Sequence, residues 1–402
     1  MTSEWNHFAL GEITELVIDY RGKTPKKLGG DWCKQGYRAL SAKNIKTGRI
    51  VQAETIRYID ESLYRKWMKD EVQRGDILIT SEAPFGQIFF WDSDEKIVLS
   101  QRLFCVRIKP EYDARFIYYY MTTPEFQSEL DGRATGTTVI GLRQPELMKC
   151  IIRCPEIQEQ KVIAAILSSI DAKIIANEKV NDNLEQQAQA IYHERFETAS
   201  PDDLHSGWRT VTLGEVATIL NKSFNPLKEP EMLLEHYSIP AFDEARFPVF
   251  DLSTSIKSNK FIIDASCFMI SKLNPTTKRV WKPYCLTGNA VCSTEFIVYK
   301  AKDKTITDFL YSVIDSNSFS DFMCSHVTGS TGSRQRTTPS DTLSYELILP
   351  SEDDLAEFQS LVSPMYAQIR INAIENDRLK RLRDSLLPKL MSGEIDVSAV
   401  QF

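Results

Sequence analysis

The fold of this chain is decided by residues 155–196, PEIQEQKVIAAILSSIDAKIIANEKVNDNLEQQAQAIYHERF. After its first residue the stretch contains neither proline nor glycine. Counted from Ile163, every seventh residue is apolar or an asparagine. The same series returns 195 residues later in the chain. Such spacing predicts two long helices that pack along a narrow stripe, in which an asparagine sacrifices stability to fix register and partner. The seam positions are Ile163, Ile170, Asn177, Leu184 and Ile191 in the first helix, and Phe358, Met365, Asn372, Leu379 and Leu386 in the second.

Length and composition place the chain among ordinary globular proteins. Its 402 residues suffice for two or three domains, and 42% hydrophobic and 26% charged residues are typical of soluble ones. No apolar run approaches the roughly 20 residues of a membrane span, and the N-terminus lacks a signal-peptide pattern. We therefore expect a cytoplasmic protein. The eight cysteines show no zinc-ligand spacing, so we expect buried reduced thiols and no metal site.

The chain divides into two similar halves of a mixed α/β (α+β) protein. We expect a first globular domain over residues 1–154, a long helix over 155–200, a second globular domain over 201–349 and a second long helical segment over 350–402. Short β-branched and aromatic runs near residues 77–80, 87–91 and 97–106 predict strands. The segment Leu213-Gly214-Glu215-Val216 echoes Leu10-Gly11-Glu12-Ile13, whereas the loops of the two halves differ. A repeat that keeps its scaffold and changes its loops is what two readers of different sequences would need.

The two long helices are expected to pack against each other. The first has a face, with Ile166, Ile174 and Val180 beside the seam, that is too apolar to be left in water. In the second, Pro364 predicts a kink or break, and we expect the helix to end near Pro388. Antiparallel packing as a coiled coil would bury both seams with Asn177 facing Asn372, and the helix pair would then fix the distance between the two domains.

The charge pattern points to a nucleic-acid partner in spite of a net charge of −7. The stretch from Arg21 to Arg49 carries nine basic residues and one acidic residue, and the excess acid lies mainly on the two helical segments. A local patch can bind phosphates on an acidic protein, because charges more than about 10 Å away are screened at 0.1 M salt. The candidates for phosphate contacts are Arg21, Lys23, Lys26, Lys27 and Lys43.

Several motifs give the chain a resemblance to a known family. They are PEIQEQKVI at residues 155–163, the two openings at residues 10–13 and 213–216, and LPKLMSGEI at residues 387–395. Asn44-Ile45, Gly48-Arg49-Ile50, Gly75-Asp76-Ile77-Leu78 and the Gly/Ser/Thr loops before each helix add to them. On these residues the chain resembles, along essentially its whole length, the specificity subunit of type I restriction-modification systems. It departs from the family in one respect: the second long helix lacks a glutamine equivalent to Gln160, which leaves open whether both helix heads make the same docking contact.

The resemblance implies a non-catalytic subunit that recognises duplex DNA. Each globular domain would read one half of a bipartite, asymmetric site, and the helices would set the spacing and dock two methyltransferase subunits, through which restriction subunits assemble. The chain itself would bind no cofactor, while S-adenosylmethionine, ATP and magnesium would be held by partner subunits. An ordinary solvated charge is the competing interpretation of each single candidate for DNA contact. Besides the phosphate candidates and Asn44, these are Arg102, Arg133, Thr137, Thr138, Arg143, Lys272, Lys278, Arg279, Arg334 and Arg336.

Two other classes of function remain open at this point. A DNA methyltransferase would need a glycine-rich cofactor loop and an Asn/Asp-Pro-Pro-aromatic tetrad, and the segments beginning at Asn225 and Asn274 lack the second proline and the aromatic residue. The five histidines are dispersed and suggest no catalytic triad or metal cluster. A coiled-coil scaffold without DNA readout is the second alternative, and the basic stretch counts against it.

Overall fold

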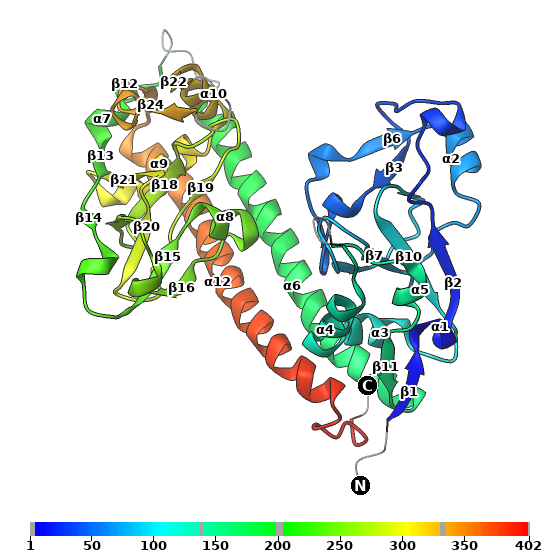
Figure 1. Ribbon diagram of the computed structural model, residues 1–402. Coiled ribbons are helices and arrows are strands. Elements are labelled where there is room, and N and C mark those ends of the chain that lie inside the picture. Colours follow the sequence, from blue (N-terminus) through cyan, green and yellow to red (C-terminus); the bar gives the residue numbers. More distant parts are fainter. Residues whose placement is uncertain (1–4, 137–139, 198–203, 330–334, 401–402) are drawn as a thin grey trace. The chain divides into compact units, whose positions relative to one another are not determined.

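The computed structural model describes residues 5–136, 140–197, 204–329 and 335–400 (Figure 1). These residues form two compact units. Unit 1 comprises Met1–Lys173 and Leu379–Phe402, and unit 2 comprises Ile174–Arg378. Each long helix therefore contributes one part to each unit.

Unit 1 is a mixed α/β structure, and its described strands form three antiparallel sheets and one mixed sheet. Strand β1 (Asn6–Ala9) pairs with β11 (Ile151–Cys154), and a four-stranded sheet has the order β2-β10-β7-β8. A further sheet has the order β6-β3-β9, in which β3 and β9 run parallel. The remaining bounds are β2 Thr14–Asp19, β3 Tyr37–Leu40, β6 Arg57–Ile59, β7 Ile77–Thr80, β8 Ile88–Phe90, β9 Val98–Leu99, β10 Leu103–Ile108, α1 Leu10–Ile13, α2 Glu61–Trp67, α3 Ala114–Met121, α4 Pro124–Arg133 and α5 Gln144–Leu147, with a small β4 (Ile45–Lys46) and β5 (Arg49–Ile50) ladder.

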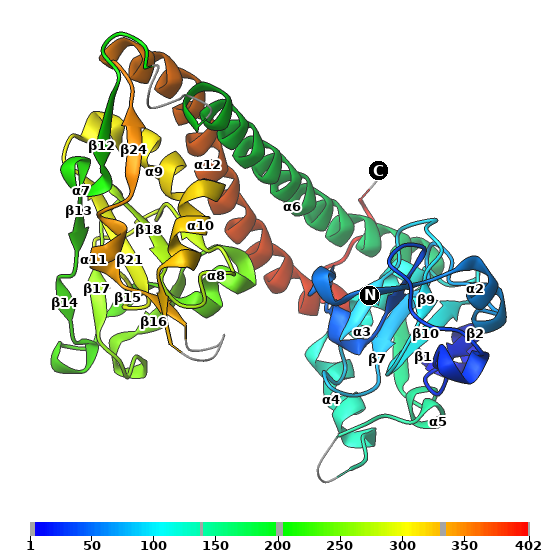
Figure 2. The ribbon, with the colours of Figure 1, turned by 90° about the horizontal axis from the view of Figure 1, so that it is seen from above.

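Unit 2 repeats this plan with an enlarged outer sheet (Figure 2). Strand β12 pairs with β24, a four-stranded sheet has the order β13-β21-β18-β19, and a five-stranded sheet has the order β14-β17-β20-β15-β16. The bounds are β12 Arg209–Thr212, β13 Ala217–Leu220, β14 Ser223–Phe224, β15 Leu233–Tyr237, β16 Val249–Leu252, β17 Lys260–Ile262, β18 Cys267–Ser271, β19 Val280–Trp281, β20 Ala290–Ser293, β21 Phe296–Ala301, β22 Val327–Thr328, β23 Arg336–Thr337, β24 Glu346–Leu349, α7 Leu213–Val216, α8 Ile239–Ala245, α9 Thr307–Ile314, α10 Asn317–Ser325 and α11 Pro339–Thr342.

The two openings that the sequence pairs are alike in atomic detail. The Gly11 N–H donates to the carbonyl of Met148 over 2.9 Å, and the Gly214 N–H donates to the carbonyl of Leu343 over 2.9 Å. A Cβ atom at Gly11 would lie 3.3 Å from both the Cβ and the carbonyl oxygen of Met148, and one at Gly214 would lie 3.2 Å from the same atoms of Leu343. Both places therefore favour glycine for lack of space, and the predicted internal duplication is confirmed.

The long helices complete the hydrophobic core of each unit. In unit 1 the core includes Ile163 and Leu167 of α6 (Ile157–Tyr192) and Leu390 of α12 (Glu352–Met391). In unit 2 it includes Tyr192 of α6 and Phe358 of α12. Most helix stability in proteins comes from packing of this kind rather than from intrinsic propensity.

The second long helix is longer and more regular than the sequence predicts. It passes through both Pro364 and Pro388 as one helix, so the expected break at Pro364 is wrong, and it ends at Met391, close to the expected end near Pro388. Both prolines are exposed, so water can bond the carbonyls that lose their N–H partners, while the buried neighbours Val362 and Tyr366 hold the backbone in helical form. Gly393, with a φ of +74°, follows the helix end.

Of the ten seam positions of α6 and α12, five are buried and five are half-buried. Ile163, Ile170, Asn177, Phe358 and Asn372 are buried. The expectation that every flanking apolar side chain is covered is wrong for Val180, whose exposed fraction is 46%. The seam residues that are half-buried are Leu184, Ile191, Met365, Leu379 and Leu386.

Asparagines from both helices form a polar layer inside unit 2. Asn177 Nδ2 donates to Asn376 Oδ1 over 2.8 Å, and Asn372 Nδ2 donates to Asn181 Oδ1 over 2.8 Å. Asn177 therefore pairs with the asparagine one turn beyond Asn372, and Asn372 pairs with the asparagine one turn beyond Asn177. The expectation that Asn177 faces Asn372 is wrong. The crossed pairing confirms that α6 and α12 run antiparallel in this unit, with a local twofold relation.

Candidate nucleic-acid interface

Three loops of unit 1 meet at one end of its four-stranded sheet and form what we call the loop frame. The loop after β7, the turn before β10 and the segment before α5 are tied together by backbone hydrogen bonds. The Ser81 N–H donates to the Arg102 carbonyl over 2.9 Å, and the Leu142 N–H donates to the Ser81 carbonyl over 2.9 Å. Thr135 and Gly141 exchange two backbone hydrogen bonds of 2.9 Å each. The loops are therefore held by main chain, which leaves their side chains free to vary.

Unit 2 builds the same loop frame from different residues. The Lys272 N–H donates to the Glu295 carbonyl over 2.9 Å, and the Thr337 N–H donates to the Lys272 carbonyl over 3.1 Å. The third loop again closes on itself, through the pairing of β22 with β23. By these bonds Arg102 corresponds to Glu295. The same backbone arrangement therefore presents a basic side chain in unit 1 and an acidic side chain in unit 2.

Each loop frame holds one arginine through an ion pair. In unit 1 Arg102 Nε lies 3.0 Å from Glu82 Oε1, and in unit 2 Arg336 Nε lies 2.9 Å from Glu295 Oε2. The side chains of both arginines are more than 40% exposed, so such pairs contribute little to stability. An arginine that is oriented but weakly held can exchange its carboxylate for the O6 and N7 acceptors of guanine.

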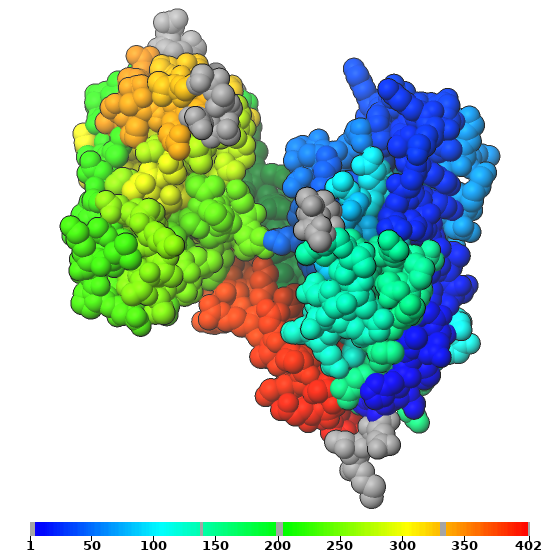
Figure 3. All heavy atoms as spheres, viewed as in Figure 1, coloured from blue at the N-terminus to red at the C-terminus, as the bar shows by residue number. Residues whose placement is uncertain are grey.

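The basic stretch lies at the surface of unit 1, where it is coloured dark blue in Figure 3. Lys26, Lys27 and Lys43 are exposed, as a phosphate contact requires. Lys23 instead donates to the backbone carbonyl of Trp67, and burial lowers the pKa of its amine. Three of the candidates are therefore exposed to solvent, and the fourth, Lys23, is hydrogen-bonded within the fold.

Two further candidates of this region have structural partners. Arg21 makes a bidentate contact with Asp19, with two N–O distances of 2.8 Å, and its guanidinium carbon lies 4.1 Å from the ring centre of Phe104. Asn44 is buried, and its amide bonds Ser41 and Thr55. Both side chains hold loops in place, which is how they would serve an interface in this conformation.

The remaining candidates are spread over both units. Arg143 is exposed at the start of α5 and Lys272 is half-buried in the unit 2 loop frame. Arg133 pairs with Glu129, Lys278 with Asp315 and Arg279 with Asp243. Thr137, Thr138 and Arg334 lie outside the described residues.

Sequence reasoning missed the acids that orient the arginines and the role of Gln160. Glu82 and Glu295 are close to their arginines only in space, so no sequence spacing identifies them. Gln160 is buried, where its Oε1 accepts from the Asp113 N–H and its Nε2 donates to the Pro155 carbonyl, both over 2.9 Å. It therefore ties the head of α6 to its own domain, and the buried Leu355 stands at the equivalent place in α12.

The part of the chain that the structure describes also bears on metal-ligand clusters, thiols and membrane spans. No group of three or more His, Cys, Asp or Glu residues there could hold a metal ion. The eight cysteines are free thiols, and five of them are buried. Among the described helices, none has the length and apolar character needed to cross a membrane.

Two repeated α/β units with matched loop frames and an antiparallel helix pair define a duplicated recognition protein. The family model described as type I restriction modification DNA specificity domain matches residues 2–186. The MjaIX specificity subunit of Methanocaldococcus jannaschii is 24% identical over 353 residues, which cover 81% of this chain and 78% of that one. The HindI specificity subunit of Haemophilus influenzae is 22% identical over 426 residues, covering 81% and 88%.

A solved structure shares the fold. The type I restriction-modification S subunit from M. genitalium has a TM-score of 0.58 and 16% identity, with 96% of each chain covered. The chain is thus similar in sequence to type I restriction-modification specificity subunits, and it shares its fold with one of them.

Proposed function

We propose that this chain is the DNA sequence-specificity subunit of a type I restriction-modification complex. The domain of residues 1–154 reads one half of a bipartite, asymmetric site, and the domain of residues 201–349 reads the other. The observation that carries this proposal is the loop frame, which recurs with the same backbone hydrogen bonds and different charges in the two units. A shared scaffold with different polar side chains is suited to recognising two different base sequences.

The long helices would set the unread spacer between the halves. At about 1.5 Å per residue, the 36 residues of α6 extend over about 54 Å and the 40 residues of α12 over about 60 Å. Half-sites that face one side of a duplex lie about 34 Å apart for each turn. A paired helix of this length is long enough to separate two readers by a helical turn of DNA.

The chain is proposed to act without catalysis of its own. Methyl transfer and cleavage would belong to two methyltransferase subunits docked on the helices and to restriction subunits reached through them, all in the cytoplasm. S-adenosylmethionine, ATP and magnesium would bind those partners. The purified chain should therefore show no turnover of S-adenosylmethionine, and measurable methyl transfer by a homogeneous sample would refute this part of the proposal.

Lengthening the helix pair tests its role as a spacer. Four residues, about one helical turn, are inserted in α6 between Asp171 and Asn177, together with four in α12 between Asn376 and Arg383. This design keeps the asparagine layer and the contacts of each domain intact. We expect methylation at the same two half-sequences with an altered number of base pairs between them. An altered half-sequence at unchanged spacing would contradict the proposal.

A further inference from the structure

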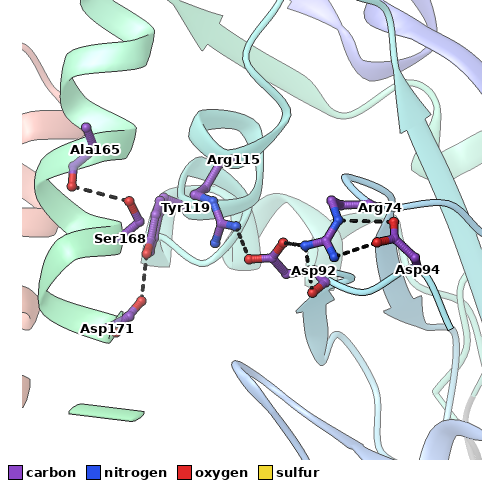
Figure 4. Close-up of polar contacts among 8 residues, drawn as sticks. All are labelled: Arg74, Asp92, Asp94, Arg115, Tyr119, Ala165, Ser168 and Asp171. Carbon is purple, nitrogen blue, oxygen red and sulfur yellow. Dashed lines mark hydrogen bonds and ion pairs between the residues drawn. The ribbon is translucent and has the colours of Figure 1, made fainter. Parts of the chain in front are cut away.

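One tyrosine of unit 1 connects its globular domain to α6 directly and to α12 through an aspartate. Figure 4 shows the contact between Tyr119 and Asp171. Tyr119, on α3, donates its hydroxyl to Asp171 Oδ2 on α6 over 2.7 Å. The other carboxylate oxygen, Asp171 Oδ1, accepts from Arg383 Nη1 on α12 over 2.8 Å. Tyr119 is 3% exposed, and burial together with the Asp171 carboxylate raises the pKa of its phenol, which stays a proton donor. The three side chains form a chain of hydrogen bonds from the domain across one helix to the other.

Unit 2 makes the equivalent connection with the sizes of the partners reversed. Ser312, which occupies on α9 the place of Tyr119 on α3, has its Oγ 2.7 Å from the hydroxyl of Tyr366 on α12. The carbonyl of Ser312 also accepts from Gln189 Nε2 on α6 over 3.2 Å. Tyr366 stands 195 residues after Asp171, at the same place of the duplicated helix. In unit 1 the domain supplies the large Tyr119 and the helix supplies the smaller Asp171. In unit 2 the domain supplies the small Ser312 and the helix supplies the large Tyr366.

The neighbouring contact on the same domain helices is less symmetric. Arg115 of α3 turns to Asp92 of its own domain, with Nη2 2.7 Å from Oδ2 (Figure 4). Its equivalent in α9, Asp308, accepts from Ser363 of α12 over 2.5 Å and also contacts Lys282. In both units the domain residue is linked to both helices, through Asp171 in unit 1 and by its own two contacts in unit 2. Recurrence with different residues indicates a docking point that the fold needs in each half.

We propose that Tyr119 with Asp171 and Arg383, and Ser312 with Tyr366, fix the position of each recognition domain on the helix pair and thereby restrict the chain to one spacer length. This inference rests on the proposed function. One base-pair step is about 3.4 Å along the duplex, so a domain that shifts on its helix by this distance can reach a half-site one base pair away. Asp171 is a positioning residue in this account, because it acts through its bonds to Tyr119 and Arg383.

The test uses the full chain in complex with its methyltransferase subunit and compares Asp171→Ala, Tyr119→Phe and Ser312→Ala with the unaltered chain. Methylation is measured on duplexes that carry the two half-sequences with the native spacer and with one base pair more or fewer. We expect the preference for the native spacer to fall about tenfold in Asp171→Ala, because a hydrogen bond to a charged group is lost. Tyr119→Phe, which removes only the hydroxyl, should show a smaller fall at unchanged fold.

A matched control removes a carboxylate from an ion pair that lies away from the two long helices, α6 and α12. Glu61→Ala breaks the exposed pair with Arg65 on α2 and should leave the spacer preference unchanged. Methylation that falls equally at all three spacings in Asp171→Ala and Tyr119→Phe would assign these residues a structural role only and overturn the inference. An unaltered complex that methylates no split site would refute the proposed function and this inference together, whereas a strict split site that both variants keep would refute the inference alone.

Discussion

Replacing one asparagine of the polar layer should cost more stability than replacing a bonded pair. Asn177 is 4% exposed, and its Nδ2 donates to Asn376 Oδ1 over 2.8 Å and to Glu375 Oε2 over 2.7 Å. In Asn177→Leu the buried amide of Asn376 loses this donor. An unsatisfied buried polar group costs about 1 to 3 kcal/mol, and the added leucine offsets part of it. We expect a net loss of about 1.5 kcal/mol.

The double variant Asn177→Leu/Asn376→Leu removes both partners and should recover most of that loss. Replacing both members of a buried polar pair by apolar groups is nearly neutral, so the coupling free energy of the double-mutant cycle should be about 1 to 2 kcal/mol. For a unit of about 200 residues, the single variant should melt about 3 to 6 °C lower. The double variant should melt close to the unaltered chain.

Urea unfolding followed by helical circular dichroism measures the cycle. Lys179→Leu, which adds a leucine at an exposed position of the same helix, is the control and should change stability by less than about 0.5 kcal/mol. A coupling free energy below about 0.5 kcal/mol, or an Asn177→Leu variant more stable than the unaltered chain, would refute the crossed asparagine pairing.

Three further expectations concern other parts of the chain. Gly11→Ala and Gly214→Ala should each lower stability by about 1 kcal/mol in thermal unfolding, because the added methyl group lies 3.2 to 3.3 Å from a neighbouring side chain and carbonyl; an unchanged melting temperature would contradict the close approach. Burial lowers the pKa of His236, with Asp251 opposing it, so its contribution is complete above about pH 6.5 and is lost as the pH falls further. His236→Gln should flatten that part of the stability curve in urea unfolding at pH 7.5 and 5.5, and a curve as steep as before would refute the assignment. Cys33, the exposed thiol, should be alkylated before the other seven, which mass spectrometry of the labelled native protein can check.

The duplication and the long helices could be predicted because they depend on residue type and spacing alone. A seam every seven residues, repeated at one offset, needs no knowledge of loops, and the glycines at 11 and 214 mark places where packing excludes a side chain. The strands of the first domain follow from short β-branched runs, as in Ile77–Thr80. These features are local or periodic, and the fold retains them.

The errors arose where tertiary contacts decide the outcome. Local rules end a helix at Pro364, yet buried residues on both sides keep it helical. The heptad positions alone place Asn177 opposite Asn372. In the antiparallel register, Asn177 instead pairs with Asn376, and Asn372 pairs with Asn181. Register depends on the whole interface, which one position per heptad does not specify.

The basic surface could be predicted from the sequence, whereas the partners of its individual residues could not. The density of basic residues between 21 and 49 identifies a surface, and Lys26 and Lys43 are exposed there. The carboxylate that engages Arg21 lies two residues away, and the one that engages Arg102 is distant in sequence. Only the folded chain distinguishes a basic side chain that faces solvent from one that holds a loop in place.

Mapping of methylated bases in genomic DNA by single-molecule sequencing tests the central claim most directly. Cells carrying this chain with a methyltransferase subunit are compared with cells that carry the methyltransferase subunit alone. We expect a split, asymmetric motif with one fixed spacer that is methylated only when this chain is present. A complex that assembles but methylates no such motif, or a motif that is the same without the chain, would contradict its role as the sequence-specificity subunit.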